Sequence, residues 1–289
     1  VRLVKKAGAT LILVGDSKQL QPIGPGGVFP HLLHKYDHPT LKTNRRQQKP
    51  EDRKAVEQLR LGNSHEAIDS YHSRGLLRRS PDHLSAAREL IESWVTAGGV
   101  QVPKDHSILV QTRKEAQVLN LAAQSGRKRA GELDSKQTLR LGETTFHVRD
   151  RVMFHKRLAS LHIENGHQGE ILRICPLRQT VHVRLDQPKP GTPAVVGIPL
   201  KLFQSAQTTL GYAATTHKFQ GATTEFAYVL MGGSAIDRNM AYTQMTRARQ
   251  RTQLFVSDAA AGDHFENLIR STAKERPKKL AHDLDQRIG

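Results

Sequence analysis

The chain has 289 residues, with 44 Lys and Arg against 27 Asp and Glu, so its formal net charge is +17. Such an excess is typical of proteins that bind polyanions such as nucleic acid, with generic solubility charge as the alternative. A single cysteine, Cys175, excludes an internal disulfide framework and a cysteine-based zinc site, and no apolar run approaches the ~18 residues of a membrane span. We therefore expect a cytoplasmic protein of about two domains with no membrane partner.

The first hundred residues predict alternating helices and a strand. Residues 1–9 resemble the end of an amphipathic helix, with Lys5 and Lys6 in its last turn and Gly8 at the C-terminal cap. The apolar run 10–14 predicts a buried parallel strand. Helices are expected over 51–62 and over 85–97, the second with Ser85 as its N-cap.

A second strand-to-helix unit follows, and then the pattern changes. The strand 108–110 ends at the polar turn 111–113, and a helix with an apolar face begins there, which is the usual ligand edge of an open α/β sheet. From about residue 145, short alternating segments separated by Gly, Asn and Pro predict a small antiparallel barrel or sandwich. The sequence then predicts a helical segment over 211–221 and a buried strand over 226–231. A helix and a final strand are expected over 239–256. The β unit is therefore an insertion in an α/β domain, and the polar tail 276–289 is expected to be a linker or a severed connection.

The segment "GDSKQLQP" places polar side chains at the end of the first predicted strand. It begins at Gly15, and Asp16 and Gln19 lie where they can position water or contact a phosphate. A loop rich in Pro and Gly, 22–27, closes the segment. A turn whose polar groups satisfy one another is the alternative interpretation.

Two segments carry clustered arginines. In "TNRRQ", Arg45 and Arg46 precede Gln47, and their rigid forks of donors match phosphate oxygens, with solvated loop charge as the alternative. In "AYTQMTRARQR", Arg247 and Arg251 share a helix face if the segment is helical. Such an arginine can neutralise the γ-phosphate in phosphoryl transfer or can face DNA.

The segment "AATTHKFQGATTEF" concentrates hydroxyl, imidazole, ammonium and amide groups around Gly221. An apolar core cannot absorb so many polar side chains, and they suit contacts with a sugar-phosphate backbone. These candidates are Thr215, Thr216, His217, Lys218 and Gln220. Two histidine pairs, 31 with 34 and 162 with 167, have no second cluster at ligand spacing, so we expect no metal site of their own.

In this order the four segments resemble motifs III, IV, V and VI of superfamily 1 DNA helicases. "ILVQTRKEAQVLN" resembles the first strand of their second motor domain, and "RDRVMFHKRLASLHIENGHQGEI" is similar to the start of the SH3-like insertion of RecD-like, 5′-to-3′ enzymes. "QGATTEFAYVL" and "KKLAHDL" are similar to the helicase part of TraI/TrwC-like (MobF-type) conjugative relaxases, which nick plasmid DNA and then unwind it.

The resemblance implies an α/β fold, a RecA-like P-loop NTPase motor domain with a parallel sheet, into which a small SH3-like β-barrel is inserted, while the N-terminal motor domain is incomplete. Residues 1–78 would be the remnant of the first RecA-like domain, with motifs III and IV. Residues 79–148 and 208–258 would form the second, with motifs V and VI, around the insertion 149–207. Residues 259–289 would be a C-terminal tail.

The resemblance also implies residue roles. Gln19 would sense the γ-phosphate, and Arg46 and Arg247 would be the arginine fingers. Further nucleotide contacts would come from Gly15, Asp16, Gln47 and Gly221. Thr112 and Arg113 would line the strand groove, and Thr215, Thr216, His217, Lys218 and Gln220 would touch the DNA backbone or relay the nucleotide state to it. One departure is that Thr223 stands where many relatives place a glutamate, with Glu225 two residues later.

A motor of this type binds ATP with a G-x-x-x-x-G-K-[ST] loop and Mg²⁺ with an acidic pair. The sequence lacks the loop, since "GGVFPHLLHK" and "GETTFHVRD" do not fit it. We expect the main cradle for ATP and Mg²⁺ on an upstream remainder of the same polypeptide, which makes this chain a fragment that hydrolyses no ATP alone.

The implied function is the C-terminal part of an ATP-dependent 5′-to-3′ DNA helicase of a conjugative relaxase. Its partners would be single-stranded DNA, the upstream remainder and the conjugation or repair machinery. A stand-alone RecD-like repair helicase and a non-catalytic basic single-strand-binding module stay open as alternatives. The aromatic content of 5% argues against the last, because such modules stack bases on aromatic side chains.

Overall fold

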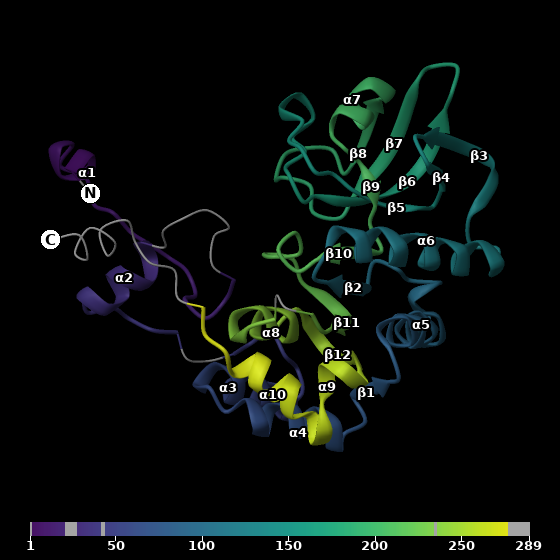
Figure 1. Cartoon of the computed structure of the whole chain (residues 1–289). Coiled ribbons are helices and arrows are strands. Elements are labelled where there is room, and N and C mark those ends of the chain that lie inside the picture. The colour runs from purple at the N-terminus through teal and green to yellow at the C-terminus, as the bar shows by residue number, and fades with distance from the viewer. Residues whose placement is uncertain (1, 21–27, 42–43, 234–235, 277–289) are drawn as a thin grey trace, which may run out of the picture.

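The computed structural model describes residues 2–20, 28–41, 44–233 and 236–276 (Figure 1). Its centre is a five-stranded sheet in which every pair of neighbours is parallel. The strands in spatial order are β1 (Leu77–Ser80), β12 (Ala248–Ser257), β11 (Thr224–Met231), β2 (His106–Val110) and β10 (Ala213–Thr215). The expected α/β fold with a parallel sheet is confirmed.

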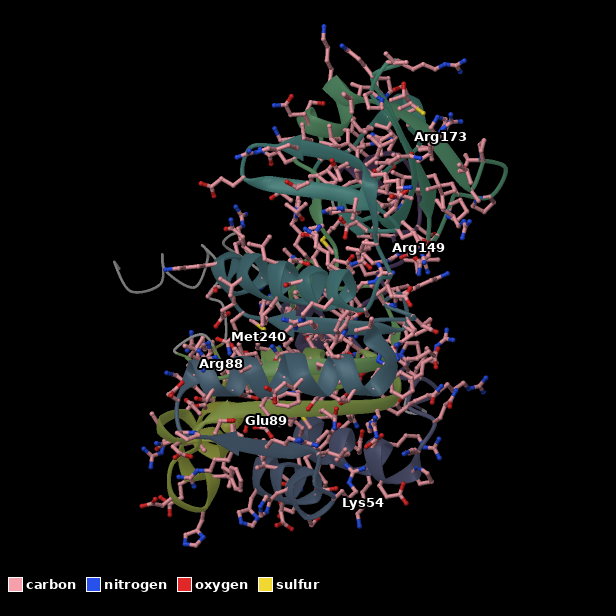
Figure 2. All side chains as sticks on the ribbon, turned by 90° about the vertical axis from the view of Figure 1, so that its right-hand side faces the viewer. Lys54, Arg88, Glu89, Arg149, Arg173 and Met240 are labelled. Atoms are coloured by element: carbon pink, nitrogen blue, oxygen red, sulfur yellow. The ribbon has the colours of Figure 1, made fainter. Side chains whose placement is uncertain are left out.

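Helices cover both faces of this sheet. Alternate side chains of its strands point to opposite sides, and the apolar side chains on each side are buried by helices. On β11, Tyr228 and Leu230 join one core cluster with Trp94 of α5, and Val229 joins the other with Leu59 of α3. The first face carries α5 (His83–Trp94) and α6 (Arg113–Arg129). The second carries α3 (Pro50–Leu61), α4 (Ser64–Ser73), α8 (Arg238–Met245) and α10 (Glu266–Ala273). Figure 2 shows Arg88 and Glu89 on α5, whose buried residues are Ala86, Leu90 and Trp94.

An antiparallel unit lies beyond α6 (Figure 1). Its five-stranded sheet has the order β8 (Val195–Pro199), β7 (Thr180–Leu185), β6 (Gln168–Cys175), β5 (Arg151–Met153) and β9 (Thr209–Leu210). The hairpin β3 (Asp134–Leu141) and β4 (Thr144–Val148) packs on β6, and the Phe146 ring on β4 meets Phe203 of α7 (Leu200–Ser205) edge to face. The expected antiparallel strands are thus present, while their SH3-like character stays a prediction.

The remaining elements are short. They are α1 (Arg2–Lys6), α2 (Val28–Lys35), α9 (Asp258–Ala261), the π-helix η1 (Val95–Gly99), and the 3₁₀ turns η2 (Ala159–Leu161) and η3 (Asp263–Phe265). The expected boundary at residue 78 falls inside β1, which pairs with β12, so α3, α4 and β1 pack with the parallel sheet. Every helix in the described ranges is too short or too polar to cross a lipid bilayer.

Several predicted elements were wrong. Residues 10–14 form no strand, and Leu11, Ile12, Leu13 and Val14 are exposed. A strand needs a neighbour to satisfy its N–H and C=O groups, and the described residues provide none there. The segment 211–221 contains β10 and turns rather than a helix. The N-cap of α5 is Asp82, whose carboxylate accepts from the Ser85 N–H, so Ser85 lies inside the helix.

Two further expectations lie outside the described residues. The Pro- and Gly-rich loop 22–27 is one, and residues 277–289 of the tail are the other. Arg276 is the last tail residue that the structure describes, and its guanidinium lies 3.9 Å from the Asp237 carboxylate.

Candidate functional site

The segment that resembles motif III is held against α8. The Leu20 N–H donates to Thr243 Oγ1 at 3.0 Å, and Asn239 Nδ2 donates to the carbonyl oxygens of Ser17 (3.2 Å) and Gln19 (2.8 Å). Asp16 shapes the turn itself, since its oxygens accept from the Lys18 N–H and from Gln19 Nε2, both within 3.1 Å. The sequence therefore brings Asp16 and Gln19 to the same helix that carries motif VI.

Arg247 lies at the centre of this contact. Its side chain is 1% exposed, and its Nε donates to the Thr243 carbonyl at 2.9 Å. Its Nη2 donates to Gln19 Oε1 (3.3 Å) and to Thr246 Oγ1 (3.1 Å). Burial, helped by the nearby Arg46, lowers the pKa of Arg247 to about 10. Within the described residues Arg247 forms no ion pair, so its buried charge has no anionic partner there.

Arg46 reaches the same place from the segment that resembles motif IV. Its Nη1 donates to the Thr246 carbonyl at 3.0 Å, and burial is the main cause that lowers its pKa. The neighbouring Gln47 is buried, and its amide group is occupied by the Ala248 carbonyl (3.1 Å) and by Asn44 (2.5 Å). Gln47, a predicted nucleotide contact, therefore attaches this segment to β12, while Arg46 faces Arg247.

The segment that resembles motif V is connected to the same helix. Thr216 is fully buried; its hydroxyl donates to the Val110 carbonyl at 3.1 Å and accepts from Gln244 Nε2 of α8 at 2.8 Å. Gln220 Nε2 lies 3.4 Å from the Leu20 carbonyl oxygen. Thr216 thereby joins α8 to the end of β2, and His217 beside it is exposed.

Two glycines of the predicted site permit close or unusual backbone geometry. Gly221 has φ +91°, a left-handed conformation that other residues rarely adopt. A Cβ at Gly15 would lie 3.1 Å from the ring of Phe29 on α2. Glu225, the displaced glutamate, accepts from Arg249 Nη1 (3.3 Å) and Gln250 Nε2 (3.0 Å) and so joins β11 to β12.

A cavity of about 440 Å³ lies between α6 and the antiparallel unit. Three predicted DNA contacts, Arg113, Thr215 and Lys218, line it. His155 lines it as well, with Nε2 2.9 Å from Thr209 Oγ1, and burial together with Lys218 and Arg113 lowers its pKa. These three predicted residues, which lie in two distant stretches of sequence, therefore share one cationic cavity.

Thr112, another predicted DNA contact, caps α6 and is not among the described residues that line the cavity. It is the N-cap of α6, where its hydroxyl accepts from the Glu115 N–H at 3.1 Å and Glu115 Oε2 accepts from the Thr112 N–H at 2.8 Å. This capping box occupies the hydroxyl in fixing the start of the helix. Thr112 thereby sets the position of Arg113 in the cavity wall.

Sequence reasoning missed the residues of α8 that assemble the cluster and the residues of the antiparallel unit that line the cavity. Asn239, Thr243 and Gln244 on α8 form the contacts to motifs III and V, and Tyr242 beside Asp16 has its pKa raised to about 12 by burial first and by Asp16 second. The signal available was the unusual polarity of a short helix in which six residues are buried. Nothing in the sequence marked His155.

The described residues contain no group of three or more His, Cys, Asp or Glu side chains that could hold a metal ion. The charge of the Asp16 carboxylate acts on Arg247, and the oxygens of Asp16 already accept two hydrogen bonds. The cluster therefore suits phosphate oxygens, and it does not by itself make a Mg²⁺ site.

Comparisons with known proteins agree with the motifs. The AAA domain family matches residues 1–82. Conjugal transfer protein TraA of Agrobacterium fabrum is 31% identical over 95% of this chain, and that of Rhizobium radiobacter is 30% identical over 96%. The chain spans about a quarter of the length of these relatives, since it covers 25% of each.

A solved structure shares the fold. The crystal structure of Pif1 helicase from Bacteroides in complex with ADP-AlF3 and ssDNA matches 97% of this chain and 67% of its own, with a TM-score of 0.53 and 17% identity. The expected resemblance to superfamily 1 helicases, and to the helicase part of conjugative relaxases, is confirmed.

Proposed function

We propose that this chain is the carboxyl-terminal part of the motor of an ATP-dependent, 5′-to-3′ DNA helicase that unwinds plasmid DNA during conjugation. The observation that carries the proposal is the buried Arg247, which contacts Gln19 at 3.3 Å, lies beside Arg46 and has no ion pair among the described residues. The names of the relatives support conjugation over a stand-alone repair helicase.

Two cations converge where a γ-phosphate would gain negative charge. Arg247 is buried and Arg46 is half-buried, and this loss of hydration strengthens their attraction for phosphate oxygens. Their backbone and side-chain hydrogen bonds fix the guanidiniums before any nucleotide arrives, so little reorganisation is needed during transfer. Mg²⁺ would neutralise phosphate charge once bound, and its ligands would come mainly from the upstream remainder of the polypeptide.

A hydrogen-bonded path leads from this cluster toward the DNA cavity. Arg247 lies in the chain just after the end of α8. Gln244 of α8 donates to the Thr216 hydroxyl, which in turn donates to the Val110 carbonyl at the end of β2. Thr215 lines the cavity one residue before Thr216. A shift of α8 on nucleotide binding would therefore move the cavity wall, which is how we propose that ATP changes the grip on single-stranded DNA.

The first motor domain is expected to be completed by the upstream remainder. Four consecutive apolar residues, 11–14, are exposed in the structure, and Val14 is 91% exposed. Apolar exposure of this kind is typical of a surface that another segment covers. The division into a first-domain remnant 1–78, a second domain 79–148 with 208–258, an SH3-like insertion 149–207 and a tail is part of this proposal. The end of the remnant, from α3 to β1, packs with the parallel sheet of the second domain.

ATP hydrolysis by the polypeptide that includes the upstream phosphate-binding loop tests the proposal. Arg247→Ala and Arg46→Ala are each expected to lower the DNA-stimulated kcat by about 10³-fold or more, since arginine fingers contribute on this scale. Arg45→Ala is the matched control, because Arg45 is exposed one residue away. If Arg45→Ala and Arg247→Ala lower kcat equally, the assignment of the fingers is wrong.

A further inference from the structure

The cavity between α6 and the antiparallel unit has an apolar floor and a polar, cationic mouth. Buried apolar side chains form the floor: Ala116, Met153, Leu210, Ala213 and Ala214. The mouth carries exposed or half-buried side chains, including Arg113, Gln117 and Lys218. Its volume of about 440 Å³ lies within the range of pockets that hold small organic ligands.

The charges of Lys218 and Arg113 at the mouth both act on the His155 side chain. Both Lys218 and Arg113 lower the pKa of His155, which lines the same cavity, although burial is the largest cause. Lys218 Nζ donates to Asn165 Oδ1 at 2.7 Å, which anchors the ammonium group to the antiparallel unit and leaves further N–H donors for an anion. A phosphate at the mouth would therefore be contacted from α6 and from the loop after β10.

A phosphate alone does not account for the floor. Backbone phosphates need donors and positive charge, which the mouth supplies, but an apolar recess behind them gains nothing from a phosphate and would hold poorly bonded water. A nucleobase has an apolar face for the Met153 thioether and the alanines, and a polar edge for Gln117, Thr144 and Thr209.

We propose that this cavity takes one unstacked nucleobase of the bound single strand, with the adjoining phosphate between Arg113 and Lys218. The inference rests on the proposed function and deepens it, because it turns a groove that follows the DNA backbone into one with a pocket for a base. Since Lys218 lies two residues after Thr216, the pocket moves with the segment that α8 contacts.

The test compares two oligonucleotides bound to the 289-residue chain, a thymidine strand and a strand of equal length and charge whose residues are all abasic. Stacking of a base on an aromatic side chain is worth about 1–3 kcal/mol, and the described lining of this pocket has no Phe, Tyr or Trp. We therefore expect a preference at the lower end of that range, about 10-fold tighter binding of the base-bearing strand by the wild-type chain. Gln117→Trp and Leu121→Trp fill the mouth from exposed positions on α6 and are expected to remove most of the preference for the base-bearing strand.

Val118→Trp is the matched control, because Val118 is exposed on α6 but does not line the cavity. For the charges, Arg113→Gln and Lys218→Gln should weaken both strands alike, whereas Lys128→Gln, about 22 Å along α6 from Arg113, should weaken neither. Thymidine monophosphate should not displace the strand at comparable concentration, because a single nucleotide lacks the flanking phosphate contacts.

The outcomes separate the pocket from the wider proposal. Binding of neither strand would remove the DNA-binding function and the pocket with it. Binding of both strands with a preference that Gln117→Trp and Leu121→Trp leave intact would overturn the pocket alone. Equally tight binding of the free mononucleotide would also overturn it, since the occupant would then be a small nucleotide rather than a base of the strand.

Discussion

At position 247 the fold keeps a guanidinium almost completely away from water. Hydrogen bonds to Thr243, Thr246 and Gln19 satisfy its donors, yet no carboxylate pairs with it in the described ranges, and burial lowers its pKa to about 10. Such an arrangement is costly for stability, because a buried charge loses its hydration without a compensating partner. The cost is understandable if the charge is needed for a ligand.

Because the buried Arg247 charge lacks an ionic partner in the described ranges, we predict that Arg247→Met raises the stability of the chain. Methionine has a similar length and no charge, so the desolvation penalty disappears, and we expect the free energy of unfolding to rise by about 1–2 kcal/mol. Denaturant unfolding of the chain without ligand measures it, with the exposed Arg45→Met as control. A fall in stability would mean that the hydrogen bonds of Arg247 outweigh its desolvation.

Individual roles at the residue scale were only partly predictable. The motif resemblance marked Arg46, Arg247 and Gln19, and the structure brings them together, while their roles with nucleotide stay predictions. Thr112, Thr216 and Gln47 illustrate the limit: the sequence marks them as polar, but polar side chains also cap helices and satisfy buried carbonyls. Only the structure separates these uses.

At the element scale, the antiparallel unit is joined to α6 by a buried polar network. Asp150 is fully buried and accepts from Tyr212 OH (2.5 Å), Gln124 Nε2 (2.6 Å) and the His147 N–H (2.7 Å). Asp150 lies between β4 and β5 of the unit, Tyr212 follows its last strand β9, and Gln124 belongs to α6. Burial raises the pKa of Asp150 despite these donors. The network fixes the wall of the cavity relative to α6.

Asp150→Ala is therefore expected to be strongly destabilising. It leaves three buried donors without an acceptor, and each unsatisfied group costs about 1–3 kcal/mol, so we expect a loss of at least about 3 kcal/mol. Chemical unfolding followed by circular dichroism measures the change, with the exposed Asp263→Ala as control. A loss below about 1 kcal/mol would show that water replaces the carboxylate.

Elements were predictable where one sequence signal dominated. The helix α3 was expected over 51–62 and is found over Pro50–Leu61, ending at Gly62 with φ +100°, because amphipathic period and a glycine cap agree. The run 10–14 failed because its apolar pattern specifies burial but not the neighbouring strand. The segment 211–221 failed because the small residues of β10 fit helix and strand patterns alike, and its strand is fixed by pairing with β2.

At the scale of the whole molecule, three histidines make stability depend on pH. Burial is the first cause that lowers the pKa of His106, of His155 and of His167. A lowered folded-state pKa means that the unfolded chain binds protons first, so this contribution is complete above about pH 6.5 and is lost as the pH falls below it. We expect lower stability at pH 5.5 than at pH 7.5.

His106→Phe isolates one contribution. His106 is buried, stacks on Phe226 with 4.6 Å between ring centroids, and has Nδ1 3.0 Å from Tyr228 OH. Phenylalanine keeps the stacking and cannot titrate, so the change in unfolding free energy between the two pH values should shrink by at most about 1.4 kcal/mol per pH unit. An unchanged pH dependence would show that His106 titrates alike in both states.

The central claim is that this chain carries the DNA grip and the arginines of a helicase motor but not its phosphate-binding loop. The most direct measurement is binding of single-stranded DNA by the 289-residue chain at two salt concentrations, with ATP turnover followed in the same sample. We predict binding that weakens steeply with salt, because the formal net charge is +17, and no protein-dependent turnover. Absence of binding, or turnover that Arg247→Ala abolishes, would contradict the account.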